Sequence, residues 1–443
     1  MAKTFGGGVR PADSKSATSS KPISEIAPPP RVIIPLSQHV GAPATPVVKP
    51  GEKVRIGSKI AEADGFVSAP VHASVAGTVK TIAEFPHPLG HSMPAVEIEN
   101  DGTDLGVELD RSRDLSEAPP DTIRDAIREA GIVGLGGAAF PTHVKLSPPE
   151  GKKITTVVLN GAECEPYLTG DHRLMVESAM EVVEGLRIMM RVVGAERGVI
   201  GVERNKADAV CRLKETVRGE HGIDVIDLKV KYPQGAEKQL IHAITGREVP
   251  RGGLPMDVGC IVQNVGTSVA VHDAVKHGRS LVSRVLTLAG SAVNRPGNFR
   301  VRIGTPVSHV IASAGGAGPD CAQIIMGGPM TGVSQATDQV PVVKATTGII
   351  LLAEKDVRVD EPGPCIRCGR CVATCPMRLM PNDISRFVER GRIDWADRYG
   401  VLDCIECGVC AYVCPSGIRH VELAREGKAR VLAARGAARR ESA

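Results

Sequence analysis

The spacing of hydrophobic residues changes along the chain. Between residues 31 and 100, short apolar runs such as RVIIPL and FVSAPVHASVAGTVKTI are separated by glycine and proline, which predicts short β-strands. From about residue 119, apolar residues recur at helical spacing between buried strands. After about residue 279 they alternate with polar residues again, as in RVLTLAGSAV. We therefore expect a multidomain protein that combines α/β and β folds.

Individual elements of the α/β part follow from the same spacing. The segment DTIRDAIREAG places Ile123, Ala126, Ile127 and Ala130 on one helical face and should end at Gly131. Buried strands are expected at ITTVVLN, GVIGVE and IDLKVKYP, and helices over 174–193 and 206–218.

Six segments follow from these changes. Residues 1–30 are rich in Ser, Lys and Pro, which is typical of a flexible arm or a wrapping segment. The segments are the N-terminal arm (1–30), a barrel-sandwich domain (31–100), an α/β domain (119–278), a β-grasp module (279–356) and a basic helical tail (421–443). Between the last two, residues 357–420 contain eight cysteines in two repeats, which predict a double-cluster ferredoxin domain.

The barrel-sandwich assignment rests on a resemblance to the lipoyl and biotinyl carrier domains. Those carriers need a lysine at a hairpin tip to hold the prosthetic group. The equivalent turn here, EADGF, has Asp64 and Gly65 and no lysine. We expect a structural relative of these domains that carries no swinging arm.

The composition fits a globular protein and argues against a nucleic-acid-binding one. Apolar residues make up 42% of the 443 residues, and the formal net charge is only +4. Aromatic residues, which form base-stacking platforms, amount to 2%. No stretch approaches about 18 consecutive apolar residues, and the N-terminus lacks the apolar core of a signal peptide. We expect a cytosolic protein without a transmembrane segment that reaches a membrane only through partners.

Two similar cysteine repeats, PCIRCGRCVATCP and DCIECGVCAYVCP, begin at Pro364 and Asp403. In the spacing C-x2-C-x2-C-x3-C-P, three cysteines bind one [4Fe–4S] cluster and the fourth binds the other. The predicted ligands are Cys365, Cys368, Cys371 and Cys414 for one cluster, and Cys375, Cys404, Cys407 and Cys410 for the second. A pair of zinc sites is the alternative, but zinc favours two close pairs of ligands. The helical pattern of DISRFVERGRIDWADRYG predicts an insertion that covers the clusters.

A glycine-rich segment, GIVGLGGAAFPTHVK, lies upstream of the first α/β strand. It formally matches the dinucleotide pattern G-x-G-x-x-A, but that pattern requires a preceding strand and a following helix. Here a helix precedes, and Pro141 disfavours helix at Phe140. The backbone N–H groups of such a loop can hold phosphate, with Lys145 nearby to neutralise charge; a flexible turn is the alternative.

Polar residues also follow the first buried strand, in VVLNGAECEPYLTGDHR. Asn160 ends the strand, and Glu163 with Glu165 places two carboxylates in a tight turn. Ligands bind at the carboxyl ends of α/β strands. Asn160 can donate to and accept from a flavin ring, whereas the carboxylates can hold ribose hydroxyls or a carboxamide. A surface acidic turn is the alternative.

Four motifs, GLGGAAFPTHVK, NGAECEP, YPQGAEKQL and VQNVGT, resemble in this order the flavin- and NADH-binding subunit of respiratory complex I. Together with the barrel-sandwich domain, the β-grasp (SLBB-like) module and the double-cluster domain, residues 5–420 resemble the RnfC family of the Rnf ion-translocating electron-transport complex. The segments FGGGVRP, PLSQHVGAPATPVVKPG and IAEADGFVSAPVHASVAGTV strengthen this resemblance.

The resemblance implies non-covalent FMN as a cofactor and NADH as a substrate, with no side-chain acid or base in catalysis. The implied FMN residues are Gly134, Gly136, Gly137, Lys145, Asn160, Glu163, Asn264 and Thr267. Those implied to contact the nicotinamide nucleotide are Phe140, Glu165 and Glu237. Two departures weaken the match, because Ala162 and Ala236 stand where the complex I relative has acidic residues.

The resemblance also implies a function. The chain would be the peripheral electron-input subunit of a membrane-bound, ion-translocating NADH:ferredoxin oxidoreductase on the cytoplasmic face of the bacterial inner membrane. Its partners would be the other subunits and, indirectly, ferredoxin. A flavin is needed because NADH delivers two electrons as hydride whereas each cluster accepts one. A soluble cobalamin reductase-like enzyme and a non-enzymatic electron relay are the alternatives.

Overall fold

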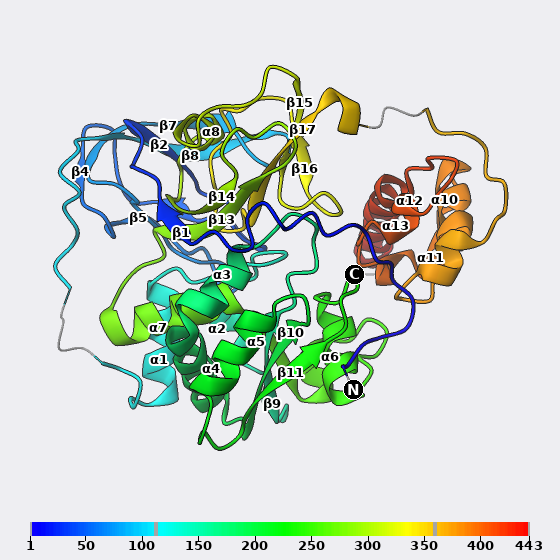
Figure 1. The fold of residues 1–443 in the computed structure, drawn as a ribbon, viewed down its shortest axis with the longest axis horizontal. Helices are drawn as coiled ribbons and strands as arrows, with labels where there is room; N and C mark the ends of the chain where they lie inside the picture. The colour runs from blue at the N-terminus through cyan, green and yellow to red at the C-terminus, as the bar shows by residue number, and fades with distance from the viewer. Residues whose placement is uncertain (1, 110–113, 358–360, 442–443) are drawn as a thin grey trace.

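The computed structural model describes residues 2–109, 114–357 and 361–441. In Figure 1 two β-rich parts lie above the α/β domain, and a helical C-terminal domain lies beside them. Within the described residues, no helix combines the length and the apolar character that crossing a bilayer requires.

The α/β domain is built on a parallel sheet in the order β11-β10-β9-β12. Its strands are β9 (Thr156–Gly161), β10 (Arg197–Glu203), β11 (Ile223–Leu228) and β12 (Cys260–Asn264). Its helices are α1 (Pro120–Glu129), α2 (Thr142–Lys145), α3 (Gly170–Glu177), α4 (Ala179–Val193), α5 (Ala207–Thr216), α6 (Glu237–Thr245), η1 (Pro255–Val258) and α7 (Val265–His277).

Alternate residues of each strand point to opposite faces of this sheet. Val157 and Leu159 belong to the large core that α1, α4 and α7 cover. Val158 packs instead with Leu240 and Ile241 of α6. Both faces are buried, which explains why the strands read as continuous apolar runs.

Two predicted elements differ from the structure. The helix expected over 174–193 is interrupted at Ser178, whose φ of −125° and ψ of 39° separate α3 from α4. The strand expected at IDLKVKYP begins earlier, at Ile223, and ends at Leu228. The residues beyond it pair with the N-terminal segment, because Tyr232 forms a bridge with Val9.

The prediction of a flexible N-terminal arm is wrong for residues 2–30, which follow the wrapping alternative. The segment crosses the middle of the molecule in Figure 1 and ends in β1 (Ile23–Glu25). Strand β1 pairs in parallel with β14 (Gly297–Arg302). The segment is polar, but it is ordered because its backbone groups and the Lys15 ammonium form hydrogen bonds with the other domains.

The barrel-sandwich domain consists of two small antiparallel sheets, β2-β8-β7-β4 and β3-β5-β6. The strands are β2 (Arg31–Pro35), β3 (Thr45–Pro46), β4 (Lys53–Val54), β5 (Lys59–Glu62), β6 (Val71–His72), β7 (Gly77–Pro86) and β8 (Ser92–Asn100). Val32, Ile34, Ile60 and Ile98 fill the space between the sheets and are fully buried.

The next module is a six-stranded sheet in the order β1-β14-β13-β17-β15-β16. Besides β1 and β14 it contains β13 (Ser283–Ala289), β15 (Cys321–Met326), β16 (Val333–Gln335) and β17 (Gly348–Ala353), with α8 (Val307–Ser313) and η2 (Glu354–Asp356). The N-terminal segment therefore supplies an edge strand to a module whose other strands begin only at Ser283.

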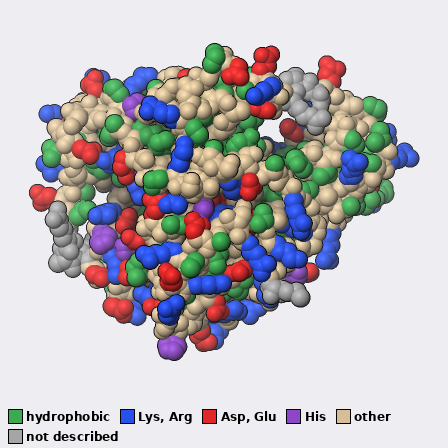
Figure 2. Space-filling model, in the orientation of Figure 1, with side chains coloured by type: hydrophobic (Ala, Val, Ile, Leu, Met, Phe, Trp, Pro, Cys, Tyr) green, Lys and Arg blue, Asp and Glu red, His purple; other side chains and the backbone are tan. Residues whose placement is uncertain are grey.

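The C-terminal domain is helical, as the spacing between the cysteine repeats predicts. It contains α9 (Arg370–Thr374), α10 (Pro381–Glu389), α11 (Ile393–Arg398), η3 (Val401–Asp403), α12 (Val409–Tyr412) and α13 (His420–Glu441). The basic tail expected as a separate segment forms most of α13, where Ala424 and Val431 pack with Ile384 and Val388 of α10. Figure 2 shows Lys and Arg interspersed with Asp and Glu over the visible face, in keeping with the small net charge.

Candidate functional site

The carboxyl ends of β9 and β12 carry two asparagines side by side. The strands pair in parallel, with Asn264 opposite Asn160. Asn264 caps α7 by accepting the N–H of Gly266 at 2.7 Å and donates through Nδ2 to Asp171 at 2.6 Å. Asn160 donates through Nδ2 to the carbonyl of Gly235 at 2.8 Å. The two side chains thus connect the loops that meet at this end of the sheet.

The glycine-rich loop folds over the same end of the sheet. It is closed by the N–H of Gly134, which donates to the carbonyl of Phe140 at 2.9 Å. A Cβ on Gly136 would lie 3.0 Å from Asn264 Nδ2, and Gly137 has a φ of +75°. The loop needs glycine at position 136 because Asn264 approaches the backbone closely there. It needs glycine at position 137 because the backbone is left-handed there. As expected, it is not the strand–loop–helix unit of a dinucleotide fold.

These loops enclose a cavity of about 950 Å³, hereafter the nucleotide cavity, near the upper end of the range for small-molecule sites. Ten of the eleven residues predicted for FMN and NADH line it. They are Gly134, Gly136, Gly137, Phe140, Lys145, Asn160, Glu163, Glu165, Glu237 and Asn264. The exception, Thr267, is fully buried beneath the glycine loop, where its Oγ1 accepts the N–H of Leu135 at 2.9 Å.

The carboxylate of Glu163 lies at the N-terminus of α3. It accepts the N–H of Asp171 at 2.7 Å and that of His172 at 3.2 Å. Unpaired N–H groups and the helix dipole both favour a negative charge there. Its neighbour Asp171 is buried in the same cavity, and burial, then the charge of Glu163, raises the Asp171 pKa to about 7.

Lys145 and Glu237 form an ion pair inside the cavity. The Lys145 ammonium lies 2.8 Å from Glu237 Oε1 and donates to the carbonyl of Val262 at 3.1 Å. Glu237 is in the first turn of α6, where a carboxylate is favoured. An incoming phosphate would therefore meet a cation that is already positioned by a carboxylate.

Glu165 is turned towards the six-stranded module. Its Oε2 accepts the N–H of Met330 at 3.0 Å, and its Oε1 accepts from the hydroxyl of Thr331. Burial raises the Glu165 pKa, and these hydrogen bonds partly offset the shift. The predicted nucleotide contact of Glu165 thus also joins the α/β domain to the loop between β15 and β16.

Two buried lysines, which no sequence pattern indicated, hold the loop after β9 from behind. Lys15 of the N-terminal segment donates to the carbonyls of Glu163 and Glu165, each at 2.9 Å, and of Leu168. Lys206 donates to the carbonyl of Ala162 at 2.7 Å. The backbone they support is strained, since Glu163 has a φ of +45°.

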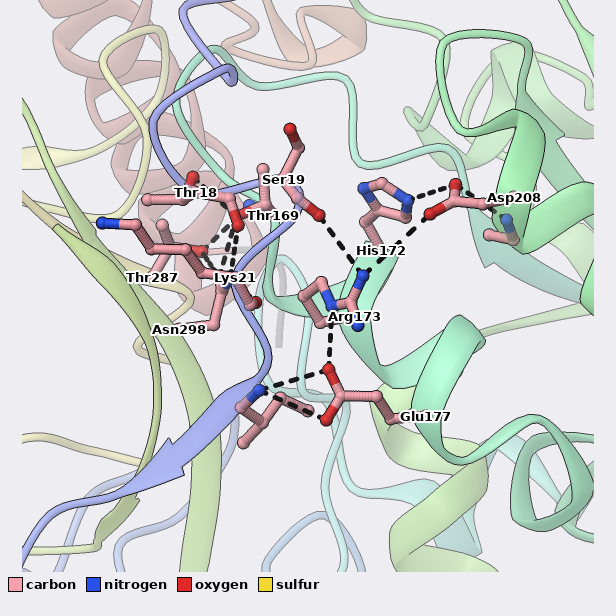
Figure 3. Close-up of polar contacts among 12 residues, drawn as sticks. Thr18, Ser19, Lys21, Thr169, His172, Arg173, Glu177, Asp208, Thr287 and Asn298 are labelled. Atoms are coloured by element: carbon pink, nitrogen blue, oxygen red, sulfur yellow. Dashed lines mark hydrogen bonds and ion pairs between the residues drawn. The ribbon is translucent and has the colours of Figure 1, made fainter.

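Figure 3 shows polar contacts that fix the N-terminal segment around Thr18. Asn298 Nδ2 donates to the carbonyl of Thr18 at 2.9 Å, and Thr169 Oγ1 donates to Asn298 Oδ1 at 2.8 Å. Glu177 of α3 accepts the backbone N–H of Ile23 at 3.2 Å. The segment is therefore anchored to α3 and to the six-stranded module, just after the loop that carries Glu163.

The eight cysteines of the repeats separate into the two predicted groups. Cys365, Cys368, Cys371 and Cys414 line one cavity, hereafter the far cluster site. Cys375, Cys404, Cys407 and Cys410 line another, hereafter the near cluster site. Burial raises the pKa of Cys407 to about 11 and of Cys410 to about 12, so bound metal ions must replace the thiol protons if these groups are to be thiolates.

The near cluster site adjoins the nucleotide cavity. Ile405 and Cys407 line both. The far cluster site opens to the surface, where Cys365 and Cys368 are exposed. The order from the nucleotide cavity outwards is thus the near site and then the far site.

The residues of the nucleotide cavity fit FMN chemically. Glycine backbone forms one wall, Lys145 offers a cation, and the buried amides of Gln239 and Gln263 each retain an atom without a hydrogen-bond partner. Buried polar atoms without partners are rare in proteins. A ligand with ring nitrogens and carbonyls would satisfy them.

Domain families match consecutive parts of the chain. Residues 3–103 match the RnfC barrel sandwich hybrid domain, and residues 127–273 match the Nuo51 FMN-binding domain. Residues 285–334 match the SLBB domain, and residues 364–418 match the 4Fe-4S dicluster domain. The predicted fold class, FMN and two [4Fe–4S] clusters are confirmed by these matches.

Known relatives cover nearly the whole chain. The C subunit of the proton-translocating ferredoxin:NAD(+) oxidoreductase complex of Clostridium ljungdahlii is 47% identical over 91% of this chain and 88% of its own length. The C subunit of the Na(+)-translocating ferredoxin:NAD(+) oxidoreductase complex of Acetobacterium woodii is 46% identical over 90% of both chains.

A solved structure supports the fold alone. A chain of an NAD+-reducing [NiFe]-hydrogenase in the H2-reduced state aligns with 72% of this chain and 61% of its own length, at a TM-score of 0.50 and 18% identity. The order of domains and the similarity to the two curated relatives agree. The chain belongs to the RnfC family of the Rnf-type ion-translocating ferredoxin:NAD(+) oxidoreductase complexes.

Proposed function

We propose that this chain is the electron-input subunit of a membrane-bound, ion-translocating NADH:ferredoxin oxidoreductase, held at the cytoplasmic face of a bacterial inner membrane by the other subunits. Family membership supports the complex, because the relatives are named as one of its subunits. The observation that carries the electron-input role is the adjacency of the nucleotide cavity and the near cluster site, which share Ile405 and Cys407.

Bound FMN would convert the two electrons of one hydride into single electrons. The glycine loop and Lys145 hold its phosphate, and Asn160, Glu163, Asn264 and Thr267 fix the surrounding loops. Phe140, Glu165 and Glu237 face the nicotinamide nucleotide. These residues position the reactants and exclude water, and none acts as an acid or base.

The four cysteines of the near site and the four of the far site would each hold one cluster, and the two clusters would carry electrons singly away from the nucleotide cavity. The exposed far site is the point of exchange with partner subunits, because a cluster behind exposed ligands can approach another carrier. The same path serves electron flow in either direction.

Anaerobic titration of the FMN- and iron-loaded protein with NADH tests this function. The flavin and cluster absorbances should both bleach, with two electrons taken up per NADH. Inert spectra would overturn the proposal and favour a non-enzymatic relay, for which the alanines at 162 and 236 are the supporting feature. If NADH reduces the flavin and the clusters fully but the protein never sediments with membranes from its native cells, the soluble cobalamin reductase-like enzyme is favoured.

A further inference from the structure

The hairpin tip of the barrel-sandwich domain reaches the nucleotide cavity. The connection between β5 and β6 carries the turn in which lipoyl-type carriers place their lysine, and here Asp64-Gly65 is followed by Phe66. Phe66 lines the nucleotide cavity together with Phe140. A domain that is separate in sequence from the α/β domain therefore contributes a side chain to its ligand site.

The ring of Phe66 is unusually open to solvent. Its exposed fraction is 62%, and of the six phenylalanines, all of which lie within the described residues, it is the only exposed one. Burying such a side chain stabilises a protein by roughly 1.5–3 kcal/mol, so an exposed ring at a cavity mouth forgoes that stabilisation. The ring is available to a ligand instead.

The tip is held rigidly over the cavity. His143 Nε2 lies 3.2 Å from the carbonyl oxygen of Phe66, to which it can donate, and the two rings meet edge to face, with centroids 6.1 Å apart. His143 lies two residues before Lys145 in α2. The same helical turn therefore contacts the hairpin tip through His143 and carries the Lys145 ammonium. At the base of the tip, the N–H of Asp64 donates to Ser68 Oγ at 3.0 Å.

We propose that Phe66 is a stacking residue for a heteroaromatic ring of the nicotinamide dinucleotide, so that the barrel-sandwich domain completes the substrate site. The inference rests on the proposed function. Planar rings stack on aromatic side chains with a gain of about 0.5–1.5 kcal/mol beyond the area buried. Phe66 acts on binding rather than on the reaction, since it lies at the mouth of the cavity on another domain.

The test compares Phe66→Ala, Phe66→Tyr and the wild type as FMN- and iron-loaded proteins under anaerobic conditions. Leu89→Ala is the matched control, because Leu89 is 60% exposed on the same domain but does not line the cavity. Calorimetry with NAD+ and with nicotinamide mononucleotide gives binding without turnover, and NADH-dependent ferricyanide reduction gives KM and kcat. FMN content and melting temperature are recorded for each protein.

Phe66→Ala should weaken NAD+ binding and raise the KM for NADH by roughly tenfold, with kcat, FMN content and melting temperature unchanged. Phe66→Tyr should restore binding, and Leu89→Ala should match the wild type. Weaker binding of both nucleotides assigns the stack to the nicotinamide, and weaker binding of NAD+ alone assigns it to the adenine.

Three results would overturn the assignment of Phe66. Unchanged binding in Phe66→Ala would show that the ring is not used. Loss of FMN in that variant, or an equal defect in Phe66→Tyr, would show a structural role. These three results concern Phe66 alone and leave the proposed function intact. If the wild type itself is not reduced by NADH, the proposed function fails, and the stacking role fails with it.

Discussion

The ammonium of Lys15 donates to three backbone carbonyls, and no carboxylate among the described residues forms an ion pair with it. It is 6% exposed, and burial lowers its pKa, while the charge of Glu163 opposes this shift. A buried ammonium is tolerated only where its hydrogen bonds offset the free-energy cost of removing it from water. The loop that carries Glu163 and Glu165 therefore depends on a residue of the distant N-terminal segment.

Replacing Lys15 by Met should lower the free energy of unfolding by about 3 kcal/mol, because buried carbonyl groups lose their donor. The variant should also retain less FMN, since the loop is no longer held. Urea denaturation followed by circular dichroism, and FMN content after gel filtration, measure the two effects. The control is Lys21→Met, whose ammonium donates to the carbonyl of Pro296 at the exposed surface. Equal effects of both variants would contradict the account.

Asp171 should make stability depend on pH. Its folded pKa of about 7 lies above the model-peptide value of 3.8, so the folded state binds the proton more tightly. The stabilisation is fully present below about pH 4 and is lost as the pH rises towards 7, at no more than about 1.4 kcal/mol per pH unit. The side chain at position 171 cannot titrate in Asp171→Asn. The free energy of unfolding of this variant minus that of the wild type should therefore increase from pH 5 to pH 8. Denaturation curves at these two pH values check this, with the exposed Asp125→Asn as control; a constant difference for Asp171→Asn would refute the assignment.

Sequence reasoning found the cavity residues that lie in motifs and missed those that do not. Glycines 134, 136 and 137 and Glu163 lie in two motifs that resemble the flavin-binding subunit of complex I, and this resemblance identified them. Lys15 lies in a polar segment without periodicity, and Phe66 is an ordinary apolar residue after a turn. Their roles depend on where distant segments come together, which local patterns do not encode.

At the level of elements, the two cluster loops contain equivalent glycines with different surroundings. Gly369 has a φ of +73° and Gly408 a φ of +78°. A Cβ on Gly369 would meet no atom within 4 Å, whereas one on Gly408 would overlap the carbonyl oxygen of Met330. Gly408 is thus required for the near cluster loop to dock on the loop between β15 and β16.

Gly408→Ala should separate the near cluster loop from its support and slow electron transfer from the flavin by roughly tenfold or more, since misplacement by about 1 Å can cost two orders of magnitude. Reduction of the flavin by NADH should be unaffected. Gly369→Ala carries the same backbone strain without the overlap and serves as control. Stopped-flow absorbance resolves the two phases, and equal slowing in both variants would mean that docking is not the cause.

Local hydrophobic spacing predicted most helices and strands but not the long-range pairings. The helix from Ala207 to Thr216 lies within the predicted 206–218 because its apolar face is regular. Strand β1 has three residues, and its partners, Asn298 to Arg300, follow it by about 275 residues in the chain. Nothing within the polar N-terminal segment specifies that partner.

Across the whole molecule, the helical domain is held against both the α/β domain and the N-terminal segment. Arg251 Nε lies 2.5 Å from Asp403 Oδ2, Gln239 donates to the carbonyl of Pro376 at 3.1 Å, and the N–H of Gly8 donates to the carbonyl of Thr374 at 2.7 Å. The N-terminal segment thus contacts the loop that carries Glu163, through Lys15, and the residue next to the near-cluster ligand Cys375, through Gly8. The molecule is arranged so that one cavity and one cluster site share a wall.

Under the proposed function, this arrangement makes the near cluster the first acceptor of electrons from the nucleotide cavity. The direct test is a variant without the far cluster, Cys365→Ala with Cys368→Ala, mixed anaerobically with NADH and frozen at intervals for electron paramagnetic resonance. The account predicts that the remaining cluster is reduced at the wild-type rate while transfer to an external one-electron acceptor is lost. If the remaining cluster instead stays oxidised beside a reduced flavin, the near site is not the first acceptor, and the central claim is contradicted.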